Sequence, residues 1–152
     1  MANDGVRTEP DRVLRWVEQV AAFCVGEGGL PPITGRILGW LMICEPAEQS
    51  AGQIAGTIQA SRASLTSNMR HLLGIGLVRR IRRPGERTAY YRIEEDAWQK
   101  VVRRRLDGLT TFGEIADEGL AILGPDGPRS ERVRAARETM AWLLEITQTM
   151  PR

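Results

Sequence analysis

Residues of the kinds that build catalytic and metal centres are scarce in this sequence. Among 152 residues it holds one histidine and two cysteines, too few for the tetrahedral nitrogen and sulfur ligand set of an ordinary zinc site. It also lacks a glycine-rich phosphate loop, a Ser/His/Asp or Cys/His set, and paired carboxylates on an apolar surface. We therefore expect no enzymatic activity, no metal and no cofactor.

Long apolar runs are also missing. No stretch reaches the roughly 18 apolar residues that a membrane-spanning helix needs, and Met1 to Gly5 lack the basic and apolar regions of a secretion signal. We expect a cytoplasmic protein with no membrane partner. In a reducing compartment Cys24 and Cys44, which fall at apolar helical positions, are expected to be buried thiols, with a redox switch as the alternative.

What is present is one ordinary core and an uneven distribution of charge. A chain of 152 residues with 42% apolar residues can bury a single core, with or without helical extensions. The formal net charge is +2, but residues 62–92 hold eight arginines and one acid, so this stretch carries +7 and the remainder −5. Such a local excess is typical of a protein that binds a polyanion; a solvated basic face is the alternative.

A helix-turn-helix is predicted just before and within this basic stretch. Ser50-Ala51-Gly52-Gln53 has the pattern of a capping box, in which Ser50 and Gln53 each satisfy the other's backbone amide. The helix that follows should end near Ile58. Gln59-Ala60 forms the turn, and Ser61 is a suitable N-cap for a second helix.

The second helix, residues 62–73, has two contrasting faces. One face is apolar and predicted to be buried: Leu65, Met69, Leu72 and Leu73. The opposite face is small, polar and basic, which suits close approach to base edges in a major groove. We expect Gly74 to end this helix in a left-handed conformation.

A β-hairpin with many arginines is predicted after Gly76. Residues 77–83 and 87–93 are rich in β-branched, aromatic and basic side chains, and the dipeptide Pro84-Gly85 between them favours a turn. A basic hairpin directly after a helix-turn-helix is the wing of a winged helix.

These residues resemble the winged helix-turn-helix of MarR-type transcriptional regulators. The resemblance is carried by Ala55, Ile58, Ala60 to Ala63, Leu65, Leu72 to Arg80 and Pro84 to Arg87. Gly29 to Pro31 and Gly35 to Leu41 are similar to the GbsR-like branch of that family, and the likeness covers most of the chain from about residue 12. In two places the chain departs from the family pattern, because Glu86 stands where an aspartate is usual and Asn68 where the residue is often apolar.

Amphipathic helices are predicted on both sides of the winged helix. The first begins at the capping pattern Thr8-Glu9-Pro10-Asp11 and ends at residues 26–29. The second begins at Pro31-Pro32 and ends before Pro46. Its buried stripe is predicted to be Ile33, Ile37, Trp40, Leu41 and Cys44.

After the wing, Glu94-Glu95-Asp96 are expected in the first turn of a helix that runs to Leu123. A last helix should span about residues 130–150. About 60 residues of amphipathic helix exceed what a winged helix of roughly 45 residues can cover, so we predict a homodimer. The predicted fold is mainly α with a small β-hairpin wing. It comprises an N-terminal arm and dimerisation helix at 1–29, a DNA-binding winged helix-turn-helix at 30–93 and C-terminal dimerisation helices at 94–152.

The predicted function is that of a transcriptional regulator that binds double-stranded DNA at a pseudo-palindromic operator. Arg70 is the best candidate for a guanine contact, and Arg87 for a minor groove. The predicted contacts are Ser61, Arg62, Ala63, Ser64, Thr66, Ser67, Arg70, His71, Arg79, Arg82, Arg83 and Arg87. Among these, Arg79, Arg82 and Arg83 are expected to neutralise phosphates, and His71 is more often a surface residue than a base contact.

The resemblance further implies a ligand-responsive repressor. A small-molecule effector is expected beside four aromatic residues, although ordinary core packing is the alternative for each of them: Trp16, Trp40, Trp98 and Phe112. In the GbsR-like branch a quaternary ammonium is a known type of ligand, which an aromatic cage would suit. A different class of function is a winged helix whose basic wing docks on an acidic protein partner.

Overall fold

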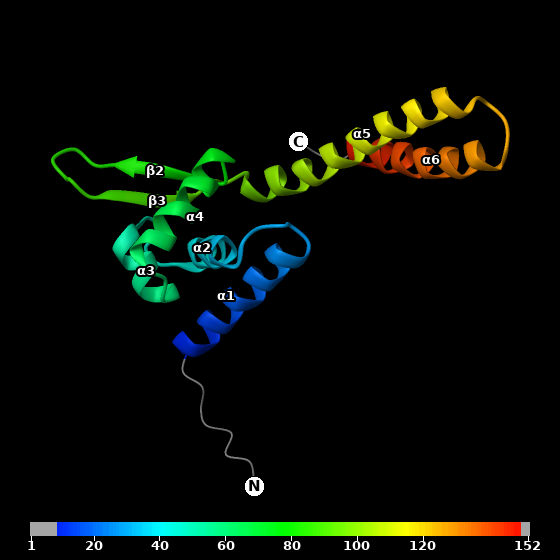
Figure 1. Cartoon of the computed structure of the whole chain (residues 1–152). Coiled ribbons are helices and arrows are strands. Elements are labelled where there is room, and N and C mark those ends of the chain that lie inside the picture. The colour runs from blue at the N-terminus through cyan, green and yellow to red at the C-terminus, as the bar shows by residue number, and fades with distance from the viewer. Residues whose placement is uncertain (1–8, 150–152) are drawn as a thin grey trace, which may run out of the picture. The chain divides into compact units, whose positions relative to one another are not determined.

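The computed structural model describes residues 9–149 and is mainly helical (Figure 1). Its elements in chain order are α1 (Glu9–Gly26), α2 (Pro32–Ile43), β1 (Gln49–Ser50), α3 (Ala51–Ile58), α4 (Arg62–Gly74), β2 (Val78–Arg82), β3 (Ala89–Ile93), α5 (Ala97–Leu123) and α6 (Pro128–Gln148). The predicted fold class, a helical protein with a small β wing, is confirmed. The chain divides into two compact units at Lys100 and Val101, inside α5, and the domain boundaries at 29/30 and 93/94 stay predictions.

Helix α2 lies at the centre of the first unit, in contact with α1, α3 and α4. Ile37 and Leu41 are buried as predicted, but Leu38 is equally buried on another side of the helix. Cys44 is buried as well, whereas Ile33 and Trp40 of the predicted stripe are only half-buried. The buried surface of α2 is wider than the predicted stripe because neighbours cover the helix on several faces. Gly35 lets α1 approach closely, since a Cβ atom there would lie 2.9 Å from the Ala21 Cα.

The helix-turn-helix has the predicted bounds and caps. Ser50 and Gln53 form both halves of the capping box, with the Gln53 amide donating to Ser50 Oγ at 3.2 Å and the Ser50 amide to Gln53 Oε1 at 2.8 Å. Gln59 makes the turn with a left-handed backbone, φ 55°. Ile54 and Ile58 of α3 are buried, as their spacing predicted.

Two details of the second helix and of the helix after the wing were wrong. Gly74 is still helical, and the left-handed residue is Gly76, with φ 72°, two positions later than predicted. Glu94, Glu95 and Asp96 precede α5 rather than filling its first turn. Thr8, the predicted cap of α1, lies outside the described residues.

A third strand joins the predicted hairpin. Besides the antiparallel pairing of β2 with β3, the two residues of β1 pair with β3, Gln49 opposite Tyr91 and Ser50 opposite Tyr90. The sheet order is therefore β1-β3-β2. Because β1 runs directly into α3, the wing is hydrogen-bonded to the beginning of the helix-turn-helix.

The second unit is an antiparallel pair of helices, the part of α5 from Val101 and α6 (Figure 1). Ala116 is buried between them, Ser130 Oγ donates to the Gly124 carbonyl at 2.8 Å, and Arg137 pairs with Asp117. Several large apolar side chains of this unit remain exposed: Val102, Phe112, Ile115, Ile122, Trp142 and Ile146. Among the described residues, no helix has the length and apolarity to cross a membrane.

Candidate nucleic-acid interface

The polar face of α4 is presented to solvent. Leu65, Met69 and Leu72 are buried on the opposite face, as predicted, whereas Leu73 is only half-buried. Every predicted contact residue on or before α4 is exposed except Ser64, which is half-buried: Ser61, Arg62, Ala63, Thr66, Ser67, Arg70 and His71. A helix that buries one stripe in its own unit and exposes small polar and basic side chains on the other side can enter a major groove.

Two hydroxyl groups on this face are already used by the helix itself. Ser61 Oγ accepts from the Ser64 amide at 3.1 Å and caps the helix. Thr66 Oγ1 donates to the Arg62 carbonyl at 2.9 Å, so its proton is committed, and the oxygen can serve DNA as an acceptor only.

Asn68, the unusual polar residue of α4, anchors the helix to α2. Its Oδ1 accepts from Thr34 Oγ1 at 2.7 Å, and its Nδ2 donates to the Ser64 carbonyl at 2.7 Å. Thr34 is fully buried. A residue that the family pattern leaves apolar therefore forms a specific polar link, which fixes the position of α4 on the centre of the unit.

Replacing Thr34 by valine should destabilise the protein by about 1 kcal/mol, because the valine has the same shape but cannot donate to Asn68, and a half-buried acceptor loses its partner. Urea unfolding measures the change. The double variant Thr34→Val/Asn68→Leu should recover most of it, since both polar partners are then gone. Thr139→Val, at an exposed site on α6, is the matched control, and equal losses at the two threonines would contradict the link.

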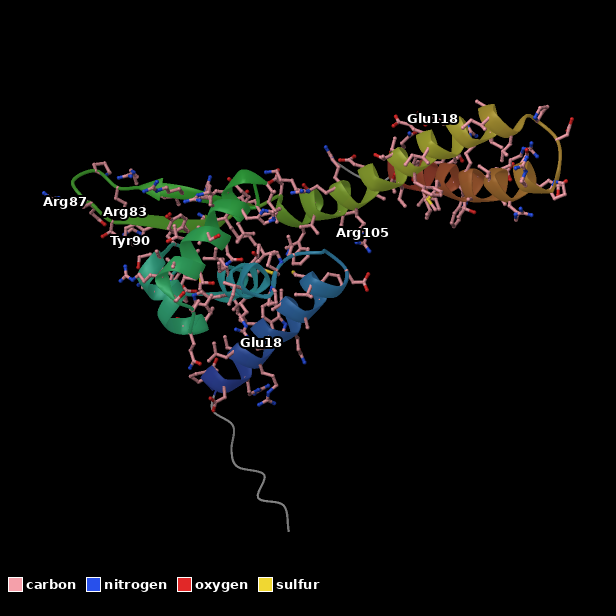
Figure 2. All side chains as sticks on the ribbon, viewed as in Figure 1. Glu18, Arg83, Arg87, Tyr90, Arg105 and Glu118 are labelled. Atoms are coloured by element: carbon pink, nitrogen blue, oxygen red, sulfur yellow. The ribbon has the colours of Figure 1, made fainter. Side chains whose placement is uncertain are left out.

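The wing tip is a tight turn that projects one arginine. Glu86 N donates to the Arg83 carbonyl at 3.1 Å, and Gly85 has φ 78°, as in a type II turn with proline before the glycine. Arg87 follows the turn and is exposed, and Figure 2 shows it at the end of the wing, pointing away from the hairpin. Within the described chain it forms no ion pair, so its guanidinium is available.

The other wing arginines fall into two groups. Arg79 and Arg82 are exposed on β2, and so is Arg80, which was not among the predicted contacts. Arg83 differs, because its Nη2 pairs with Glu48 Oε2 at 2.8 Å and its Cζ lies 3.9 Å from the centre of the Tyr90 ring. Glu48 and Tyr90 were also missed. No local pattern could reveal Glu48, since it precedes Arg83 by 35 residues.

The four aromatic residues predicted beside an effector are distributed over both units. Trp16, Trp40 and Trp98 are half-buried in the first unit, where Trp98 packs against Phe23 with ring centres 6.4 Å apart. Phe112 belongs to the second unit and is 43% exposed. A pocket of about 310 Å³ between α1, α2 and the end of α3 is lined by none of the four; its walls are Leu14, Arg15, Val17, Glu18, Arg36, Thr57, Ile58 and Gln59.

The two cysteines are buried thiols, as predicted. Desolvation by burial raises the pKa of both Cys24 and Cys44. Since the thiolate is the reactive form, both side chains are poorly suited to act as a redox switch.

The chain resembles known transcriptional regulators along nearly its whole length. Residues 96–150 match the family described as MmpR5-like MarR family transcriptional regulator. The HTH-type transcriptional regulator MmpR5 of Mycobacterium tuberculosis is 34% identical over 148 residues, covering 95% of this chain and 88% of that protein. A crystal structure of a transcriptional regulator superposes with a TM-score of 0.69 at 30% identity, over 90% of this chain and 93% of that one.

The matching family is the MmpR5-like one, so the finer resemblance to the GbsR-like branch stays a prediction. Membership of the wider family agrees with the exposed face of α4 and with the basic wing. The chain belongs to the MarR family of DNA-binding transcriptional regulators.

Proposed function

We propose that the protein is a homodimeric, ligand-responsive repressor that binds a pseudo-palindromic site in double-stranded DNA. Each subunit would place α4 in a major groove and Arg87 in the adjacent minor groove. The observation that carries this proposal is the shared exposure of one polar helix face and of the wing-tip arginine within a stretch of charge +7. Docking of the wing on an acidic protein is the less favoured alternative, given the family.

Exposed apolar side chains support the homodimer. Ile122 is 84% exposed, Trp142 59% and Ile115 57%. Large apolar side chains gathered on a helix pair mark an interaction surface. The occupant proposed here is a second copy, because a dimer also supplies the two-fold symmetry that a pseudo-palindromic site requires.

Selection of bound fragments from random duplex DNA tests the proposal. We expect a consensus with two inverted half-sites, spaced by about one helical turn or a multiple of it. An asymmetric consensus would contradict the dimeric arrangement, and the absence of any enriched sequence would contradict sequence-specific binding.

The affinity for the selected duplex should depend steeply on salt. With about six to ten phosphate contacts per dimer, affinity should fall by roughly 10³- to 10⁵-fold between about 50 and 200 mM salt. Mobility-shift titrations at several salt concentrations measure the slope. A flat dependence would exclude the arginine-rich wing as a phosphate-binding surface.

The effector-binding role of Trp16, Trp40, Trp98 and Phe112 belongs to the same proposal. A ligand can lower the DNA affinity only by as much as its own affinities for the DNA-bound and DNA-free states of the regulator differ. Tryptophan fluorescence, titrated with candidate small molecules with and without the selected duplex, should therefore give two different affinities. A ligand that quenches equally in both titrations is not coupled to DNA binding.

A further inference from the structure

One wing arginine is held by its own protein rather than offered to solvent. Glu48 comes directly before β1, and Arg83 comes directly after β2. The two side chains form an ion pair of 2.8 Å, and the Arg83 guanidinium lies over the Tyr90 ring of β3 at 3.9 Å. Figure 2 shows Arg83 and Tyr90 near each other on the wing, closer to its base than Arg87. The three residues thus tie the wing to the segment that leads into α3.

These residues also feel the charge of the wing tip. The nearby Glu86 carboxylate raises the pKa of Tyr90, and the hydrogen bond to Glu48 raises the pKa of Arg83. Glu86 is the last residue of the tip turn and the neighbour of Arg87. We call Glu48, Arg83 and Tyr90, which contact one another, the wing clamp. It joins the residue before β1 to both strands of the wing.

The backbone pairing makes this clamp an effective connection. Tyr90 lies opposite Ser50 in the sheet, and Ser50 is the N-cap of α3. The base of the wing is therefore fixed to α3 by strand pairing, whereas the part beyond β2 depends on side chains. Arg83 and Glu48 supply a hydrogen-bonded ion pair at that point. The planar guanidinium of arginine is pre-organised, so little side-chain freedom is lost for each hydrogen bond that it forms.

The charges argue against a direct role for Arg83 with phosphate. A carboxylate beside a DNA-facing hairpin repels phosphates, and its pairing with Arg83 offsets one of the positive charges of the wing. One of the guanidinium donors is used by Glu48, and one of its faces is covered by Tyr90. Arg79, Arg80 and Arg82 meet no such partner within the described chain and remain exposed.

We infer that Arg83 and Glu48 are positioning residues for DNA recognition: they set the direction of the wing relative to α3, and so place Arg87 in the minor groove. This inference rests on the proposed DNA-binding arrangement. It predicts that removal of the Glu48 carboxylate weakens DNA binding. Electrostatic repulsion between a carboxylate and phosphates alone would predict that its removal strengthens binding.

The test compares Glu48→Ala, Arg83→Ala and the double variant on the duplex that the wild-type protein selects from random DNA. Each single variant should lose affinity by about 3- to 30-fold, and the double variant should be no weaker than Arg83→Ala, because the two residues act as one unit. Hydroxyl-radical footprinting should show weaker minor-groove protection at the wing positions, with the protection around the major-groove half-sites retained.

Matched controls separate positioning from charge. Glu45→Ala removes an exposed acid from the same loop and should leave affinity unchanged or slightly raise it. Arg82→Ala should lower the slope of log affinity against log salt by about one per subunit, as expected for a phosphate contact, whereas Arg83→Ala should leave that slope unchanged. Thermal unfolding checks that each variant is folded. If Glu48→Ala does not fold, Glu48→Gln is used in its place.

The inference is overturned if Glu48→Ala strengthens or does not change DNA binding, or if Arg83→Ala reduces the salt slope as much as Arg82→Ala does. Those outcomes would leave the proposed function intact, because selection of a symmetric site and the slope change at Arg82 would persist. A wild-type protein that selects no sequence at all would instead remove the proposed function itself.

Discussion

Replacing Arg70 by alanine should lower affinity for the selected operator by about 30-fold to 10⁴-fold. A bidentate arginine–guanine contact contributes about 1–3 kcal/mol, and a symmetric dimer makes it twice. Arg70 is exposed on the polar face of α4, in an element whose position is fixed by buried residues and by the link from Thr34 to Asn68. Fluorescence anisotropy with the selected duplex measures the loss.

The loss at Arg70 should be specific to one base pair in each half-site. Repeating the selection with Arg70→Ala should relax the consensus there and leave the other positions unchanged. Arg132→Ala, at an exposed arginine of α6, is the control for the removal of one positive charge and should have little effect. A uniform loss over all sequences would assign Arg70 to a phosphate instead.

Replacing Trp142 by alanine should weaken the proposed homodimer by about 10³-fold or more in its dissociation constant. A tryptophan at the centre of an interface costs about 2 kcal/mol or more when truncated, and two-fold symmetry counts it twice. Trp142 is 59% exposed within its own unit, so its truncation removes little packing inside the subunit. Sedimentation velocity over a range of protein concentrations measures the change.

Trp142→Phe is the matched control, since it keeps an aromatic side chain and should retain most of the dimer affinity. Loss of the dimer should also abolish binding to a two-half-site duplex at protein concentrations below the new dissociation constant. If Trp142→Ala is as dimeric as the wild type, Trp142 of α6 is not part of the interface. Phe23 and Val25, which are exposed on α1, are then the next candidates.

Local signals account for the parts of the fold that could be predicted. The capping box at Ser50 and Gln53 and the N-cap Ser61 place two helices with their correct ends, because capping depends on residues three positions apart. The dipeptide Pro84-Gly85 places the turn of the wing, because a turn also depends on neighbouring residues alone. Gly74 shows the limit of such signals, since two nearby glycines could each end α4 and only Gly76 does.

Long-range partners account for what could not be predicted. The short strand β1 has no pattern of its own and exists because β3 is beside it. Arg83 looked like the other wing arginines in sequence, and only its pairing with Glu48 distinguishes it. The burial of Leu38 follows from how many helices surround α2, and the period of a single helix does not carry that information.

Because both cysteine side chains are buried, their chemical reactivity can be used to measure local opening of the first unit. Cys24 in α1 and Cys44 after α2 lie in the first unit and are at most 8% exposed. A thiol-specific reagent can modify them only when that unit opens locally, so the labelling rate measures the opening equilibrium without any engineered label. If labelling is slower when operator DNA is present, the ratio of the two rates measures how far DNA binding shifts this equilibrium toward the closed state.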